Sequence, residues 1–259
     1  MGHKVHPKIF RMSTVGSWDS KWFSKNNYKQ FLREDVIMRA YLKKKLREAA
    51  IDKIAIDRSR KTITITVHTA KPGYIIGRAG SGIEDLKKEL KTKFFPGTRQ
   101  VININVQDIG QGSLSAAVTA EQVAMDIEKR MPFRRVMKQT VERVMKSGAS
   151  GVRIIVAGRL NGADIARSER VNQGSVPLQN LRANIQYAHA EANTVFGVIG
   201  VKVWIYLGEV FGDEKAEAGK LSNDRRGGDR GGRPSGRRDG DRRGGDRGGR
   251  GRGGDRNSR

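Results

Sequence analysis

The stretch Ile75-Ile76-Gly77-Arg78-Ala79-Gly80-Ser81-Gly82-Ile83 decides how the first half of the chain folds. Because glycine has no Cβ, a loop built on Gly77 and Gly80 lets a sugar-phosphate strand approach its backbone, and the amides that begin the next helix attract phosphate. Arg78 adds a positive charge. The pattern alone is equally typical of a tight strand-to-helix connection. Its spacing disfavours a mononucleotide site, because it matches neither Gly-X-Gly-X-X-Gly nor a Gly-Lys-Ser/Thr phosphate loop.

Periodic apolar residues on both sides of this loop predict one small domain. In chain order its elements are a helix, a two-stranded hairpin, a second helix and a last strand, at residues 35–50, 54–67, 82–93 and 101–106. This order resembles the αββααβ arrangement of a type II KH domain, in which such a loop clamps about four nucleotides of a single RNA strand. The resemblance implies that the RNA-binding residues of the loop are Lys71, Gly77, Arg78, Ala79 and Gly80.

A second unit of helices and strands follows the first. A helix over residues 114–130 is broken at Pro132, whose fixed φ suits the start of another helix that runs to Lys146 and is capped by Gly148. Four strands are predicted after it, at residues 152–157, 165–171, 182–189 and 198–207. The chain is therefore expected to be α+β, with helices packed on a mainly antiparallel sheet in this second domain.

The helix after Pro132 has one apolar face and one basic face. At about 100° per residue, Arg134, Arg135 and Lys138 fall within a narrow arc. The apolar residues that gather on the other face are Phe133, Met137, Val141 and Val144. One face is expected to pack and the other to meet solvent or RNA, although a solvated face explains most basic helices.

Positive charge is the strongest compositional signal. The 51 Lys and Arg residues against 27 Asp and Glu give a formal charge of +24, which favours a polyanionic partner. Residues 220–259 hold 14 basic and 6 acidic groups, so the rest of the chain keeps +16. The predicted organisation is an N-terminal arm (1–34), a KH domain (35–108), a second α+β domain (109–211) and a disordered Arg/Gly/Asp-rich tail (212–259). The tail is expected to hold RNA loosely or merely to aid solubility.

Other classes of protein receive little support. The absence of Cys excludes disulfides and cysteine metal clusters and fits a cytoplasmic protein. No apolar run of about 20 residues and no signal peptide are present, so no membrane is expected. His189 shares the apolar register of Ile185 and Tyr187 and is expected to be a core histidine. No catalytic grouping, cofactor, metal site or small-molecule substrate is indicated.

Several further blocks, in order, resemble the family of the bacterial small-subunit ribosomal protein number three. Ala79 stands where that family usually has a second basic residue, and the Arg/Gly tail is outside its pattern. The blocks are Met1-Gly2-His3-Lys4-Val5-His6-Pro7, Trp18, Trp22-Phe23, His68-Thr69-Ala70-Lys71-Pro72-Gly73, Phe133-Arg134-Arg135, Gly158-Arg159-Leu160, Val176-Pro177-Leu178 and Gly197-Val198-Ile199-Gly200-Val201-Lys202-Val203-Trp204-Ile205.

This resemblance implies a non-enzymatic component of the small-subunit head that binds 16S rRNA. Its neighbours would be the tenth and fourteenth small-subunit proteins in the head and the fourth and fifth at the mRNA entrance. In that family, basic residues of the second-domain helix contact incoming mRNA and help to unwind it, and Arg134, Arg135 and Lys138 occupy those positions. Two rivals remain at this point: a free KH-type RNA chaperone, and a nuclease or lyase.

Overall fold

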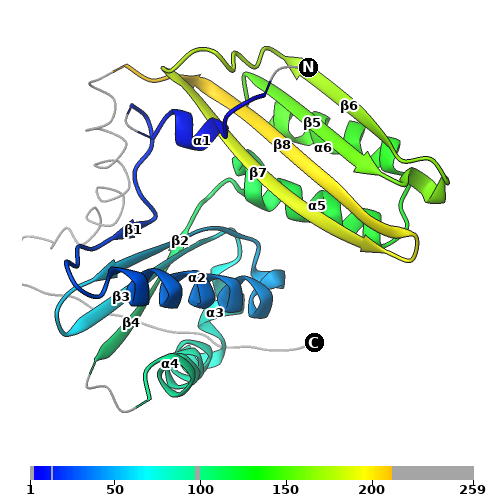
Figure 1. Ribbon diagram of the computed structural model, residues 1–259. Coiled ribbons are helices and arrows are strands. Elements are labelled where there is room, and N and C mark those ends of the chain that lie inside the picture. Colours follow the sequence, from blue (N-terminus) through cyan, green and yellow to red (C-terminus); the bar gives the residue numbers. More distant parts are fainter. Residues whose placement is uncertain (1–2, 13, 97–99, 212–259) are drawn as a thin grey trace, which may run out of the picture. The chain divides into compact units, whose positions relative to one another are not determined.

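The computed structural model describes residues 3–12, 14–96 and 100–211 (Figure 1). The tail predicted over 212–259 lies outside these residues. Two four-stranded sheets organise the described chain. None of the described helices is both long and apolar enough to cross a bilayer.

The first sheet has the strand order β1-β2-β3-β4. Strands β1 and β2 pair in parallel, β2 and β3 are antiparallel, and β3 and β4 are parallel. The alternation predicted in the hairpin is confirmed, because Ile63, Ile65 and Val67 of β3 are buried while the threonines between them are not. The bounds are β1 Ser20–Lys21, β2 Ile51–Arg58, β3 Thr62–Thr69 and β4 Val101–Asp108.

Two long helices cover one face of this sheet, α2 Tyr28–Lys45 and α4 Ser81–Phe94 (Figure 1). Met38 and Leu42 from α2 and Leu86 and Leu90 from α4 are buried in one core with the isoleucines of the strands. Burial of such side chains stabilises each by about 1.5–3 kcal/mol relative to exposure. Short helices link these elements: the 3-10 turns η1 Arg47–Ala49 and η2 Arg78–Gly80, and α3 Pro72–Ile76.

The first long helix departs from the sequence prediction at both ends. It begins at Tyr28, inside the predicted N-terminal arm, and ends at Lys45, before the predicted end at residue 50. Its early start has a tertiary cause: the ring of Phe31 lies 5.6 Å from that of Trp22 and 4.9 Å below the guanidinium carbon of Arg58. A second departure from the sequence prediction is strand β1, which the sequence did not indicate.

The second sheet is antiparallel throughout, with the strand order β6-β5-β8-β7, as expected for this domain. Helices α5 Ala116–Glu128 and α6 Phe133–Lys146 cover one face of it (Figure 1). The strands are β5 Gly151–Gly158, β6 Arg167–Gly174, β7 Ala183–Thr194 and β8 Gly197–Glu209, and the 3-10 turns η3 Gly112–Leu114 and η4 Leu160–Gly162 complete the unit. Val152, Val201 and Ile205 are fully buried under the helices.

The predicted cap of α6 is confirmed. Gly148 has φ +96°, its amide donates to the carbonyl of Met145, and the next amide, of Ala149, reaches the carbonyl of Val144. This is the paired bonding that satisfies the last carbonyls of a helix. Pro132 is the residue that precedes the helix, with φ −58°.

His189 is exposed, so its assignment to the core was wrong. Ile185, Tyr187 and His189 do lie on the same face of β7, as predicted, but this face is turned away from the helices. The core face of β7 carries Ala188 and Ala190 instead, whose small side chains give a weak apolar signal.

Candidate nucleic-acid interface

The loop quoted first is an exposed connection between two helices. Helix α3 ends at Ile76, and Arg78 and Ala79 lie exposed before α4 begins at Ser81. Gly80 has φ +84°, a left-handed backbone conformation that favours glycine. A Cβ at this position would meet nothing within 4 Å, so the space above the loop is open. Ala79 also adopts a left-handed conformation, with φ +50°.

Gly82 has a different reason to be glycine. A Cβ at this position would lie 2.7 Å from the carbonyl oxygen of Ile75, closer than real contacts allow. The start of α4 therefore packs directly on the backbone of α3. Gly77 is constrained by the same contact, since a Cβ there would lie 2.9 Å from the amide nitrogen of Gly82. Two of the three glycines in the quoted stretch therefore serve the packing of α3 on α4, and only Gly80 has open space beside it.

The electrostatics of the loop suit an anion. No side chain caps the first turn of α4, so the positive end of that helix remains available. Arg78 is exposed and forms no ion pair among the described residues. Lys71 precedes α3, and its Nζ lies 5.9 Å from the ring centre of Tyr74. Four of the five residues predicted from the sequence, Gly77, Arg78, Ala79 and Gly80, thus lie in one turn that can bind phosphate, whereas Lys71 lies at the other end of α3.

Helix α6 presents the second basic surface. Phe133, Met137 and Val144 are buried, whereas Arg134, Arg135 and Lys138 are all exposed. The three cations therefore share the solvent face that their spacing predicts.

One of these three cations is engaged by a carboxylate from the sheet. Arg134 Nη2 lies 3.1 Å from Oε1 of Glu169 on β6, and Arg167 Nε lies 3.3 Å from the same oxygen. The hydrogen bond from Arg134 lowers the pKa of Glu169 and raises that of Arg134. Arg135 and Lys138 have no such partner in the described part of the chain, so they are the more available to a phosphate.

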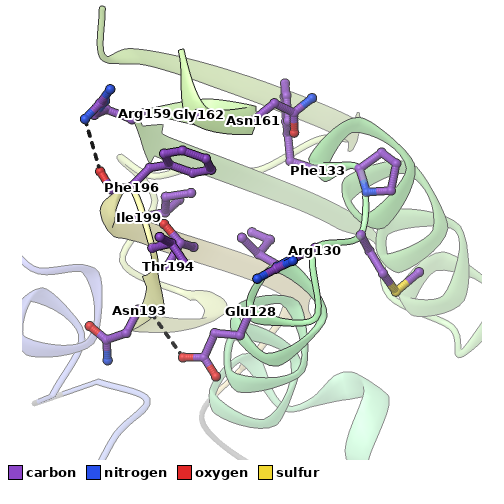
Figure 2. A pocket seen from close by; sticks show the side chains of 14 residues that line it. Glu128, Arg130, Phe133, Arg159, Asn161, Gly162, Asn193, Thr194, Phe196 and Ile199 are labelled. Carbon is purple, nitrogen blue, oxygen red and sulfur yellow. Dashed lines mark hydrogen bonds between the residues drawn. The ribbon is translucent and has the colours of Figure 1, made fainter. Parts of the chain in front are cut away.

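A pocket of about 550 Å³ opens beside the first turn of α6, between the α5–α6 connection and the tip of the β7–β8 hairpin (Figure 2). Phe133, Phe196 and Ile199 supply apolar walls. Two of its charged side chains already have partners within the protein: Arg159 donates to Asp164, and Glu128 accepts from the backbone amide of Asn193. The pocket suits a flat apolar group and offers no reactive grouping.

The sequence reasoning missed a third surface, the face of the second sheet opposite the helices. Arg153 on β5 and Lys202 and Trp204 on β8 point there. The signal was present in the strict alternation of β8, where Val201, Val203 and Ile205 are buried and the residues between them are not.

These features define an RNA-binding protein of the KH class joined to a second α+β domain. Comparison with known proteins agrees: residues 37–114 match the KH domain family, and residues 123–205 match the family described as ribosomal protein S3, C-terminal domain. A relative from Syntrophomonas wolfei, "Small ribosomal subunit protein uS3", is 48% identical over 215 residues, which cover 83% of this chain and 93% of the relative. A protein of the same name from Caldicellulosiruptor saccharolyticus is 48% identical over 221 residues, covering 85% and 98%.

The chain therefore belongs to the family of small ribosomal subunit protein uS3. A further relative of that name, from Listeria monocytogenes, is 45% identical over 222 residues, covering 85% of this chain and all of the relative. The resemblance stated from the sequence motifs is confirmed. The family is one of structural and not enzymatic proteins, which disfavours the nuclease or lyase alternative.

Proposed function

We propose that this chain is a structural constituent of the small ribosomal subunit in the cytoplasm, that it binds 16S rRNA, and that it lines the entrance for mRNA. The observation that carries the proposal is the exposed basic arc of α6, on a helix whose opposite face is buried in the core. Family membership supports the ribosomal location. The tenth and fourteenth small-subunit proteins are its proposed neighbours in the head, and the fourth and fifth at the mRNA entrance.

Sedimentation through sucrose gradients tests the ribosomal role. A tagged chain expressed in bacterial cells should be recovered with small subunits in a near one-to-one ratio. Recovery only in the light fractions would favour a free KH-type RNA chaperone.

The KH loop yields the first prediction. Replacing Arg78 and Ala79 with Asp places two negative charges where phosphate is proposed to bind, beside the open space above Gly80. Affinity for single-stranded RNA should fall, with the fold intact because both side chains are exposed. Fluorescence anisotropy at moderate salt measures the affinity, and circular dichroism checks the fold. Changing Glu84 and Asp85 on α4 to Gln is a control for charge changes nearby. Unaltered affinity in the Asp variant would remove the loop from the RNA-binding surface.

The basic arc of α6 yields the second prediction. Changing Arg134, Arg135 and Lys138 to Ala should leave assembly intact and slow translation through stable mRNA hairpins, because three phosphate contacts are lost. Elongation on structured and unstructured messages is compared. Changing Arg143 and Lys146, at the far end of the same helix, to Ala is the control. Equal slowing on both kinds of message would point to a general assembly defect.

Glu169 allows a change in the opposite direction. The carboxylate of Glu169 forms an ion pair with Arg134. Glu169→Gln should therefore free that guanidinium for mRNA and slightly speed translation through stable mRNA hairpins. The gain should be small, because water screens an exposed ion pair.

A further inference from the structure

The outer face of the second sheet, the face turned away from α5 and α6, combines aromatic and basic side chains in register. Arg153 on β5 lies opposite Trp204 on β8, and Trp204 lies opposite Tyr187 on β7. The rings of Tyr187 and Trp204 are 5.0 Å apart, and the guanidinium carbon of Arg153 lies 5.3 Å from the centre of the Trp204 ring. These three side chains form a continuous platform across three strands.

The next row of the same face is basic. Ile155 on β5 lies opposite both Arg170 on β6 and Lys202 on β8, and Lys202 lies opposite His189 on β7. Arg170, Lys202 and His189 are exposed. Two cations, Arg170 and Lys202, therefore lie in a row parallel to the aromatic platform, one step along the strands.

These cations lack the carboxylate partners that occupy their neighbours. Arg159 and Arg167 each contact an acidic side chain, but none of Arg153, Arg170 and Lys202 does within the described ranges. The Nε of Arg153 is also buried without a hydrogen-bond partner there, a state that destabilises a fold unless a ligand supplies the acceptor. An unbalanced cluster of this kind is more readily explained by an absent anion than by the fold.

The segment of residues 3–12, which contains α1 Pro7–Phe10, forms one wall of this surface. His6 meets the edge of the Tyr187 ring at 4.8 Å, and Lys4 adds a further positive charge to the lining. The resulting groove has a volume of about 730 Å³ and contains no acidic side chain in its lining. Its size lies in the range of sites that hold one ligand-sized group.

We propose that this outer face is a third RNA-binding surface, which takes an unpaired segment of ribosomal RNA. A base stacks on the platform of Arg153 and Trp204, and the flanking phosphates lie against Lys202 and Arg170. Single-stranded RNA fits because stacking requires bases that are splayed out, and sheet faces that pair aromatic with basic residues bind RNA in this way. The inference rests on the proposed rRNA binding and adds a surface to it, separate from the KH loop and the α6 arc.

The test uses the full chain and a fluorescein-labelled single-stranded RNA of about 12 nucleotides, the length range that such surfaces hold. Arg153→Gln with Lys202→Gln should weaken binding roughly tenfold or more, because the stacked base loses the guanidinium of Arg153 and one phosphate loses Lys202. The slope of log affinity against log salt should become shallower by about 0.7, the contribution of one single-strand phosphate. The control removes the same charge from the other side of the sheet, with Arg143→Gln and Lys146→Gln, and should bind like the original chain.

Trp204 supplies a readout that a purely structural role would not move. RNA at this face should quench the tryptophan emission of the original chain, and Trp204→Phe should lose most of that quenching, because the other two tryptophans lie by the first sheet: Trp18 just precedes β1, and Trp22 packs against Phe31 of α2. Equal affinity and slope in Arg153→Gln/Lys202→Gln and its control would overturn the proposal. Unchanged RNA binding with failure to enter small subunits would also overturn it, and would identify the face as a protein contact. Incorporation of the original chain into subunits tests the ribosomal role separately.

Discussion

Replacing Asp35 with Ala should destabilise the KH domain by about 3 kcal/mol, because the buried guanidinium of Arg58 loses its buried partner and, among the described carboxylates, keeps only Glu34. The Asp35 carboxylate is fully buried. One oxygen accepts from Arg58 Nε and Nη2 at 2.8 and 2.6 Å, and the other accepts from Ser20 Oγ at 2.7 Å and Trp22 Nε1 at 2.8 Å. The single carboxylate thus joins α2, β2 and strand β1 with its flanking residue.

Urea unfolding, followed by circular dichroism, measures this loss. A matched pair of variants separates the lost ion pair from the lost packing: Asp35→Leu combined with Arg58→Leu removes both charges and should be less destabilising than the sum of the two single changes. An exposed pair is the control, and Glu142→Ala, which breaks its contact with Lys146, should leave stability almost unchanged because water screens that pair. A loss below about 1 kcal/mol in Asp35→Ala would contradict the role of this carboxylate.

The KH fold was predictable because local patterns and long-range packing agree. Alternation in β3 and the spacing of Leu86 and Leu90 in α4 each point to the face that is buried. The start of α2 was not predictable in the same way. It depends on Trp22 and Arg58, which meet Phe31 only after folding, and no propensity of residues 28–34 records those contacts.

The basic arc of α6 was predictable from helical periodicity alone, but which of its cations pairs with a carboxylate was not. Arg134 and Glu169 are separated by 35 residues, and only the packing of α6 beside β6 brings them together. The platform of Arg153 and Trp204 needed strand register as well as alternation, because a residue's partner across a sheet is fixed by the pairing of whole strands. The sequence therefore predicts which residues share one face of a helix or strand more readily than it predicts sites that combine residues from several strands.

Arg11→Ala should destabilise the described fold by about 3 kcal/mol or more, since hydrogen bonds made by a buried charged group contribute about 1.5–3 kcal/mol each without adding fully. Arg11 is 3% exposed, and burial lowers its pKa. Its guanidinium donates to the carbonyls of Pro7, Pro177, Leu178 and Asn180 at 2.7–3.3 Å, so it fastens the segment of residues 3–12 to the β6–β7 connection.

Arg11→Lys is the matched control. It keeps the charge but cannot reach all four acceptors, so it should recover only part of the loss. Because this segment also walls the groove beside Tyr187, Arg11→Ala should weaken RNA binding at the outer face even at temperatures where the chain remains folded. Full stability and full affinity in Arg11→Ala would show that the segment does not depend on this anchor.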